Sequence, residues 1–320
     1  MNAPNRGTFV PVIDLSSGSD AELAARIGEA LQTAGFFSIV GHGVPKAVFD
    51  DAFAVSRRFF SMPDPVKSRW HVDQSPHRHG FDPIGWQSLD VGQPPDLKES
   101  FYLGIERGPD HPLVKRGVEN QGPNQWPDES LVPGFQAACN TYSAAMLALV
   151  LRLMHLCATA LKLPEGHFDS FMRDPTCTTR LLHYPPQPAT ASPGQIGCGA
   201  HTDWGALTLL AQDDAGGLQV QTLQGDWIDI APLPYGLVVN AGDMMQRWTN
   251  DLWRSTMHRV INRHSGHDRF SIAYFFDLDH FASIEPLPGC VEPGQPARYA
   301  PITAGEHLLE MYRRTTVAAA

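Results

Sequence analysis

The stretch His201-Thr202-Asp203-Trp204-Gly205-Ala206-Leu207-Thr208-Leu209-Leu210-Ala211 carries two potential metal ligands and continues into an apolar run. We expect residues 201–211 to form one strand. Apolar runs of similar length, separated by turn residues such as Gly216-Gly217, predict further short strands at 179–184, 218–221, 227–230 and 237–240. This spacing is typical of a barrel-like sandwich. We therefore predict a mainly β chain with flanking helices and a double-stranded β-helix, or jelly-roll, core.

His201 and Asp203 form a candidate pair of metal ligands. Side chains alternate between the two faces of a strand, so these two would point the same way and Thr202 the opposite way. His258 lies 55 residues after Asp203, which leaves room for several strands between them. A jelly-roll would place the His258 strand beside the His201 strand. Two imidazoles and one carboxylate on one side of a metal ion are typical of non-heme Fe(II) sites with open coordination positions.

A second pair of polar residues has the same spacing on a later strand. The run Arg269-Phe270-Ser271-Ile272-Ala273-Tyr274-Phe275-Phe276 places Arg269 and Ser271 on one face. A guanidinium group pairs bidentately with a carboxylate, and a neighbouring hydroxyl can donate to the same oxygens. Together with the metal ligands, this pair predicts a keto acid bound across both groups.

Each of these features also has an ordinary structural explanation. In a chain with 14 histidines, an isolated His-x-Asp is found often by chance. Arg269 and Ser271 could likewise lie on an exposed strand with ordinary salt bridges. The combination is far more specific than either part, because Arg269 follows His258 by 11 residues in the order that the proposed site requires.

Several motifs along the chain resemble the plant-type Fe(II)/2-oxoglutarate-dependent dioxygenases, the family that includes isopenicillin N synthase. In the C-terminal half they are His201-Thr202-Asp203-Trp204-Gly205, Asn240-Ala241-Gly242-Asp243, His258-Arg259-Val260 and Arg269-Phe270-Ser271. In the N-terminal half they are Val12-Ile13-Asp14-Leu15, Gly35-Phe36-Phe37, Gly41-His42-Gly43-Val44-Pro45 and Phe59-Phe60-Ser61-Met62-Pro63. Order and spacing agree throughout, and the resemblance covers residues 8–280.

The resemblance implies a role for six residues. The implied iron ligands are His201, Asp203 and His258, and the implied contacts of 2-oxoglutarate are Arg269 and Ser271 at its distal carboxylate and Tyr184 as a further support. The chain departs from the family pattern at Leu182, where many relatives have asparagine, so one contact to 2-oxoglutarate is missing or replaced.

The activity implied by the resemblance uses Fe(II), 2-oxoglutarate as cosubstrate and dioxygen. Oxidative decarboxylation of 2-oxoglutarate to succinate would be coupled to hydroxylation, desaturation or cyclisation of a small organic metabolite. Two other functions remain open. Isopenicillin N synthase and the plant ethylene-forming oxidase share the Arg-x-Ser pair without using 2-oxoglutarate. The second open function is that of a catalytically silent jelly-roll binding protein or of a barrel with structural zinc. Three ligands without cysteine do not suit a closed zinc site, however.

Composition limits the possible partners. The formal charge of −10, from 24 basic and 34 acidic residues, argues against a surface that follows nucleic-acid phosphates. Residues 142–163 approach membrane-spanning length, but Arg152, His155 and Lys162 interrupt or close them, so we expect a buried amphipathic helix and no membrane. The five cysteines are widely spaced and Met1–Thr8 lacks a signal-peptide core, which predicts a cytoplasmic protein. We expect a monomer or weak oligomer.

The chain divides into three predicted regions. Residues 1–170 should form an N-terminal region whose helices pack on the barrel, including a helix at 21–34 that follows the Ser19-Asp20 cap signal. Residues 171–280 should form the β-helix core, and residues 281–320 a C-terminal extension that ends in a helix. Residues 75–95, rich in proline and glycine, are a candidate lid or substrate wall, although a solvated loop is the simpler interpretation.

Overall fold

A larger and a smaller β-sheet lie face to face in the computed structural model, which describes residues 9–90, 92–192, 194–262 and 266–315. The segment Met1–Thr8 and the last five residues of the predicted C-terminal extension lie outside these ranges. The larger sheet contains β1 Val12–Asp14, β2 Phe36–Val40, β3 Gly80–Asp82, β4 Glu99–Gly104, β5 Pro175–Tyr184, β7 Leu207–Gln212, β10 Leu237–Ala241 and β12 Arg269–Asp279. Its strand order is β1-β2-β10-β7-β12-β5-β4-β3.

The smaller sheet contains β6 Cys198–His201, β8 Leu218–Gln221, β9 Trp227–Asp229 and β11 His258–Val260, in the order β6-β11-β8-β9. Its strands pair antiparallel, as do those of the larger sheet apart from the parallel pair β1 and β2. The strands predicted for the second half of the chain are confirmed to within one residue at β8, β9 and β10, while β5 begins four residues earlier than expected.

One predicted strand is wrong. Residues 201–211 do not form a continuous strand, because β6 ends at His201 in the smaller sheet and β7 begins at Leu207 in the larger one. Residues 202–206 cross between the sheets. Asp203 therefore lies in the crossing segment and not on a strand, and simple alternation does not explain where its side chain points.

Alternation along β12 explains why the larger sheet has two different faces. Ile272, Tyr274 and Phe276 pack into the main hydrophobic core, on the side that the helices cover. Ser271 and Ala273 point the other way, toward the smaller sheet. The helices thus stabilise one face of the sheet, and the other face is left to form the wall of an internal cavity.

The helices are α1 Asp20–Thr33, α2 Lys46–Phe60, α3 Asp64–Lys67, α4 Pro112–Lys115, α5 Phe135–Ala160, α6 Asp243–Trp248 and α7 Ala304–Thr315. Short 3-10 turns lie at η1 Ser68–Trp70, η2 Val72–Gln74, η3 Glu165–Phe171 and η4 Pro288–Cys290. The predicted first helix is confirmed: Ser19 caps α1 through a reciprocal pair of hydrogen bonds with Glu22.

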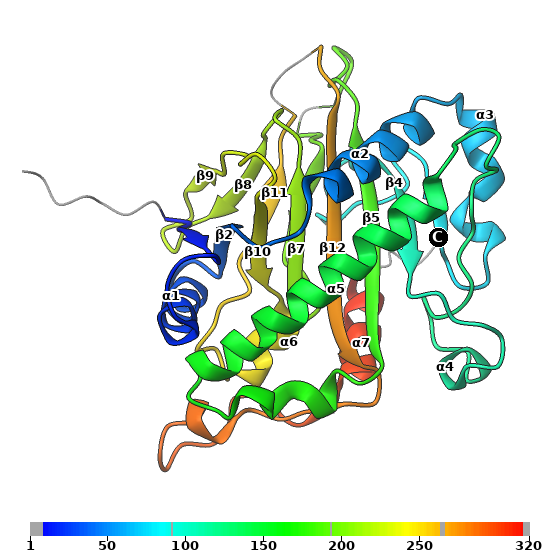
Figure 1. The fold of residues 1–320 in the computed structure, drawn as a ribbon. Coiled ribbons are helices and arrows are strands. Elements are labelled where there is room, and N and C mark those ends of the chain that lie inside the picture. The colour runs from blue at the N-terminus through cyan, green and yellow to red at the C-terminus, as the bar shows by residue number, and fades with distance from the viewer. Residues whose placement is uncertain (1–8, 91, 193, 263–265, 316–320) are drawn as a thin grey trace, which may run out of the picture.

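The long apolar helix α5 crosses the outer face of the larger sheet, and it packs against α1 near its C-terminal end and against α2 near its N-terminal end (Figure 1). It begins seven residues before the predicted start at Tyr142, and the residues that contact the sheet and the other helices are buried. Its length and hydropathy would also suit a membrane span. The packing of α5 against β7, β12, α1 and α2 accounts for its apolar character as that of a core helix.

The C-terminal segment packs next to the crossing segment that carries Asp203. After β12 the chain forms the hairpin β13 Ser283–Ile284 and β14 Ile302–Thr303, and then α7. The imidazole Nε2 of His307 on α7 hydrogen-bonds to the carbonyl of Trp204, at 3.0 Å. This contact ties the last helix to the residue that follows Asp203.

Candidate functional site

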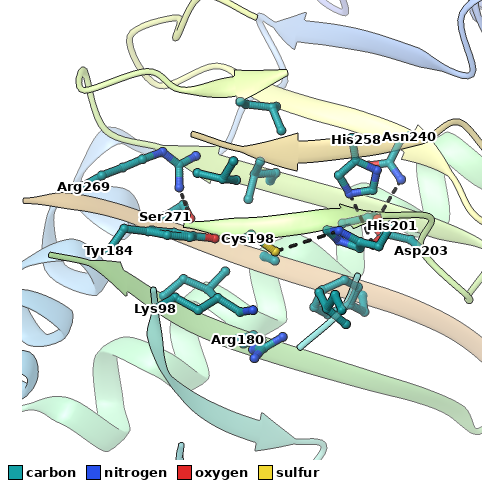
Figure 2. Close-up of a pocket in the computed structure, with 18 of the residues that line it drawn as sticks. Lys98, Arg180, Tyr184, Cys198, His201, Asp203, Asn240, His258, Arg269 and Ser271 are labelled. Carbon is teal, nitrogen blue, oxygen red and sulfur yellow. Dashed lines mark hydrogen bonds and ion pairs between the residues drawn. The ribbon is translucent and has the colours of Figure 1, made fainter. Parts of the chain in front are cut away.

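A cavity lies between the two sheets and opens to solvent. Side chains from β5, β7, β10 and β12 of the larger sheet line it, together with side chains from β6, β8 and β11 of the smaller sheet. Figure 2 shows His201, Asp203 and His258 at one end and Arg269, Ser271 and Tyr184 at the other. All six residues singled out in the sequence therefore reach one cavity.

His201, Asp203 and His258 converge closely enough to hold one metal ion. The Nε2 atoms of His201 and His258 lie 3.9 and 3.6 Å from Oδ1 of Asp203. One ligand atom from each residue lies within 4.8 Å of the others. His201 and His258 are direct partners across the β6 and β11 pair, which brings the two imidazoles together although they are far apart in sequence.

Backbone carbonyls fix the orientation of both imidazoles. Nδ1 of His201 lies 2.8 Å from the carbonyl of Gly199, and Nδ1 of His258 lies 3.1 Å from the carbonyl of Thr256. A carbonyl can only accept, so each Nδ1 carries the hydrogen and each Nε2 offers a lone pair. Burial lowers the pKa of His201, and burial together with His201 lowers the pKa of His258 to about 4. Both rings are therefore neutral at neutral pH, the form that binds a metal ion.

The carboxylate of Asp203 is held in its ionised form. Burial by itself would raise its pKa, but the neighbouring imidazoles and hydrogen bonds from Thr208 and Asn240 outweigh burial and lower the pKa. The amide of Asn240 donates to Oδ2 at 2.7 Å, which leaves Oδ1 directed toward the two histidines. Asn240 belongs to the quoted Asn240-Ala241-Gly242-Asp243 motif, and the structure indicates what that asparagine does.

Arg269 is a buried cation, and none of the carboxylates in the described part of the chain pairs with it. Its side chain is 1% exposed, and its guanidinium donates to the carbonyl of Gly216, to Oγ of Ser271 and to Oε1 of Gln212. Among the described residues, no carboxylate oxygen lies within 4 Å of the guanidinium. Because a buried charge is costly unless it is paired, this arrangement favours an anion bound in the cavity.

Tyr184 lies beside Arg269 at the same end of the cavity. The two residues are direct partners across β5 and β12, and the guanidinium carbon lies 4.7 Å from the centre of the tyrosine ring. Burial raises the pKa of Tyr184, so its hydroxyl keeps its proton and can donate a hydrogen bond. Leu182, the position at which the chain was expected to depart from the family pattern, also lines the cavity and presents an apolar side chain to it.

Two basic residues of the cavity were not predicted as site residues. Lys98 and Arg180 both line it. Arg180 lies four residues before Tyr184 on β5, so alternation along the strand was a usable signal that the two side chains share a face. From the proline-rich segment 75–95, Leu89 lines the cavity and Gln87 hydrogen-bonds to Arg180. The segment 75–95 therefore supplies part of the cavity wall, through an apolar side chain and an amide.

Gly205 allows the crossing segment to approach β12. A Cβ at this position would lie 1.9 Å from Oδ1 of Asp277 and 3.0 Å from the carbonyl oxygen of Phe276. We expect Gly205→Ala to displace the segment that holds Asp203, to lower the free energy of unfolding by about 1–3 kcal/mol and to weaken metal binding.

Denaturant unfolding and a metal titration would measure both effects of Gly205→Ala. Gly225→Ala is the control for the loss of a glycine, because a Cβ there meets no atom within 4 Å, although its positive φ carries a small cost. A Gly205→Ala protein with unchanged stability and unchanged metal affinity would show that the close approach is not needed.

Comparison with known proteins identifies the family. A sequence model of the 2OG-Fe(II) oxygenase superfamily matches residues 175–278, and a model described as the N-terminal region of a non-haem dioxygenase in morphine synthesis matches residues 10–129. The 2-oxoglutarate-Fe(II) type oxidoreductase hxnY of Emericella nidulans is 36% identical over 318 residues, covering 98% of this chain and 90% of that protein. The chain belongs to the 2OG-Fe(II) oxygenase superfamily.

Other proteins agree with this family in sequence and in structure. The 2-oxoglutarate-dependent dioxygenase citB of Monascus ruber is 38% identical, covering 96% of this chain and 95% of that protein. The crystal structure of a full-length Neurospora crassa protein in complex with alpha-KG superimposes with a TM-score of 0.85 at 32% identity, and 98% of each chain is covered. A second structure of the same Neurospora crassa protein holds thymine as well, at a TM-score of 0.84, 31% identity and coverage of 98% and 99%.

These similarities confirm the predicted fold and chemistry. The chain has the double-stranded β-helix fold of the oxygenases and is an Fe(II)- and 2-oxoglutarate-dependent dioxygenase that uses dioxygen. Its residues fit these groups, because two neutral imidazoles and one ionised carboxylate meet at one point and an unpaired buried guanidinium lies in the same cavity. Small molecules occupy both solved complexes of the Neurospora crassa protein.

Proposed function

We propose that this oxygenase oxidises a small organic molecule, with hydroxylation as its default outcome, and that six residues of the cavity carry the reaction. In this proposal His201, Asp203 and His258 hold Fe(II), while Arg269, Ser271 and Tyr184 hold 2-oxoglutarate. The observation that carries the proposal is the buried Arg269, which has no carboxylate partner among the described residues and shares a cavity with the three convergent ligands.

Arg269, Ser271 and Tyr184, at the end of the cavity proposed to bind 2-oxoglutarate, each have a different role. Arg269 neutralises the distal carboxylate of 2-oxoglutarate in a site shielded from water, where charge pairing is strong. Ser271 accepts a hydrogen bond from Arg269 at 3.1 Å, so its own hydroxyl hydrogen is available to the same carboxylate. The protonated Tyr184 hydroxyl offers a further donor. The guanidinium is itself held by the Gly216 carbonyl at 2.6 Å, which fixes its direction before the ligand arrives.

At the other end of the cavity, hydrogen bonds orient one ligand atom each of His201, Asp203 and His258. The Gly199 and Thr256 carbonyls keep both Nε2 atoms free, and the Asn240 amide keeps one oxygen of Asp203 pointed at them. When bound, Fe(II) supplies the redox chemistry that activates dioxygen, which side chains alone cannot do. Leu89, Leu210 and Phe275 form apolar walls around this end and limit the access of water to it.

A turnover assay tests whether 2-oxoglutarate use is coupled to the proposed oxidation of a small organic molecule. We expect release of succinate and carbon dioxide in a one-to-one ratio with substrate oxidation, strictly dependent on Fe(II) and 2-oxoglutarate. The alternative is an oxidase of the isopenicillin N synthase or ethylene-forming type. Full activity with iron and ascorbate, without 2-oxoglutarate and without any succinate, would establish that alternative.

We also propose that the protein acts as a monomer or weak oligomer in the cytoplasm, without nucleic-acid or membrane partners. Cys139, Cys157, Cys177 and Cys198 are buried free thiols whose pKa values burial raises, as suits a reducing compartment.

We propose the three predicted regions, 1–170, 171–280 and 281–320, as its domain organisation. A catalytically silent jelly-roll binding protein would not need convergent metal ligands, so the three ligands favour an enzyme over that alternative.

A further inference from the structure

Arg180 faces the cavity at a distance from the end that holds Arg269. On β5, residues 180, 182 and 184 all line the cavity, as alternation requires. Tyr184 pairs with Arg269 across β12, whereas Arg180 pairs with Ala273, four residues further along that strand. At about 3.3 Å per residue, the two arginines start about 13 Å apart along the sheet. Figure 2 shows Arg180 low in the centre of the view, near Lys98 and apart from Arg269 at the upper left.

The charge of Arg180 is only partly balanced. Its side chain is buried, with 7% of the residue exposed, and its NH2 group donates to Oε1 of Gln87 at 2.9 Å and to Oγ of Ser100 at 3.0 Å. Both acceptors are neutral. Its nearest carboxylate is Asp82, at 3.9 Å, beyond hydrogen-bonding distance. Burial raises the pKa of Asp82, against the opposing effect of Arg180.

The neighbouring Lys98 has a partner of its own. It forms a direct ion pair with Asp96, and Asp96 also accepts a hydrogen bond from the backbone of Gly199 at 2.8 Å. Lys98 is therefore neutralised, and the pair helps to position β6. Among the described residues, Nε of Arg180 is buried without a hydrogen-bond partner. On this wall, Arg180 is the cation with unused donor capacity.

Much of the remaining lining of the cavity is apolar. Phe36, Leu89, Leu210 and Phe275 line the cavity and offer no polar side-chain atom to a ligand. A molecule bound here would meet an apolar surface along its body and one guanidinium at its end. Pockets of this kind select ligands by a few polar groups set in an apolar lining.

We propose that Arg180 binds a carboxylate of the primary substrate, which is a small carboxylic acid with an apolar body. This inference rests on the proposed function, because it assigns 2-oxoglutarate to the Arg269 end and leaves Arg180 for the second ligand. The guanidinium pairs with the acid and holds the apolar body along the wall toward His201 and His258. Arg180 is in this role a residue that determines specificity.

Matched pairs of acids and amides test the proposal by calorimetry. The anaerobic protein is first loaded with Fe(II) and saturated with 2-oxoglutarate, so that the Arg269 end is filled. It is then titrated with 3-phenylpropanoate and hexanoate and with the corresponding primary amides. We expect the wild type to bind each acid at least tenfold more tightly than its amide. In Arg180→Gln the preference should fall below twofold, with the affinity for 2-oxoglutarate within twofold of the wild type.

Arg173→Gln is the matched control, because Arg173 is exposed just before β5 and outside the cavity; it should keep the full acid preference. If Arg180→Gln does not fold, Arg180→Lys replaces it, and acid affinity should fall at least threefold while amide affinity is unchanged. Equal binding of acids and amides by the wild type, absence of acid binding, or an equal loss for both ligand types in the variant would overturn the inference. Failure of 2-oxoglutarate to bind the wild type would instead overturn the proposed function.

Discussion

Replacing Asp203 by alanine is expected to weaken Fe(II) binding by at least about 100-fold, since even residues that only support a metal ligand contribute about 10- to 100-fold. The substitution removes the single anionic ligand, and two neutral imidazoles remain, 10% and 18% exposed at the side chain. It also removes the acceptor for the Asn240 amide and leaves that group unpaired in a buried position. An anaerobic titration of the metal-free protein with Fe(II) measures the loss.

The control for Asp203→Ala is Asp226→Ala, which removes an exposed carboxylate in the turn between β8 and β9. It should bind Fe(II) as the wild type does. Circular dichroism and thermal unfolding of both variants separate a lost ligand from a lost fold. Fe(II) affinity within threefold of the wild type in a folded Asp203→Ala protein would contradict the assignment of Asp203 as a ligand.

Replacing Arg269 by glutamine should weaken 2-oxoglutarate binding by about 100-fold, on the order of 3 kcal/mol, the range found when one partner of a buried charge pair is removed. Fe(II) binding should be spared, because Arg269 hydrogen-bonds to Gly216, Ser271 and Gln212 and to none of the metal ligands. The visible charge-transfer band of the iron chelate, followed during an anaerobic titration with 2-oxoglutarate, reports the affinity.

Two further variants make the test of Arg269 specific. Arg269→Lys keeps the charge but loses the planar fork, so its affinity for 2-oxoglutarate should lie between those of the wild type and Arg269→Gln. Arg173→Gln removes an exposed arginine and should leave the affinity unchanged. An Arg269→Gln protein that binds 2-oxoglutarate as tightly as the wild type would rule out the proposed carboxylate contact.

Local patterns predicted most of the secondary structure. Strand β8 is found at the predicted residues 218–221, and α1 lies within one residue of its predicted bounds, because a cap residue, a glycine and an alternating or helical pattern all act within a few residues. The start of α5 was missed by seven residues. Residues 135–141 extend the helix, and Phe135 and Cys139 in this stretch are buried in the main core, so tertiary packing decides where the helix begins.

The pair His201 and Asp203 shows where local reasoning fails. The two side chains do converge, but not because one strand carries both. The chain leaves the smaller sheet after His201, and Gly205 permits the tight crossing to β7, with Gly242 close to the Gly205 carbonyl. A crossing between sheets depends on contacts with β12 and β10, which are distant in sequence, so no local pattern predicts it.

The sequence by itself determined the ligand types, their order, and the alternating strands that carry Arg269 and Ser271, because these depend on residue chemistry and on a period of two. Only the tertiary structure decided that the charge of Arg180 is incompletely balanced, and that Asn240 orients Asp203. Burial and partnership depend on which chain segments meet. The charge of a side chain can be read from the sequence, whereas the presence of a counter-charge is settled only when distant strands come together.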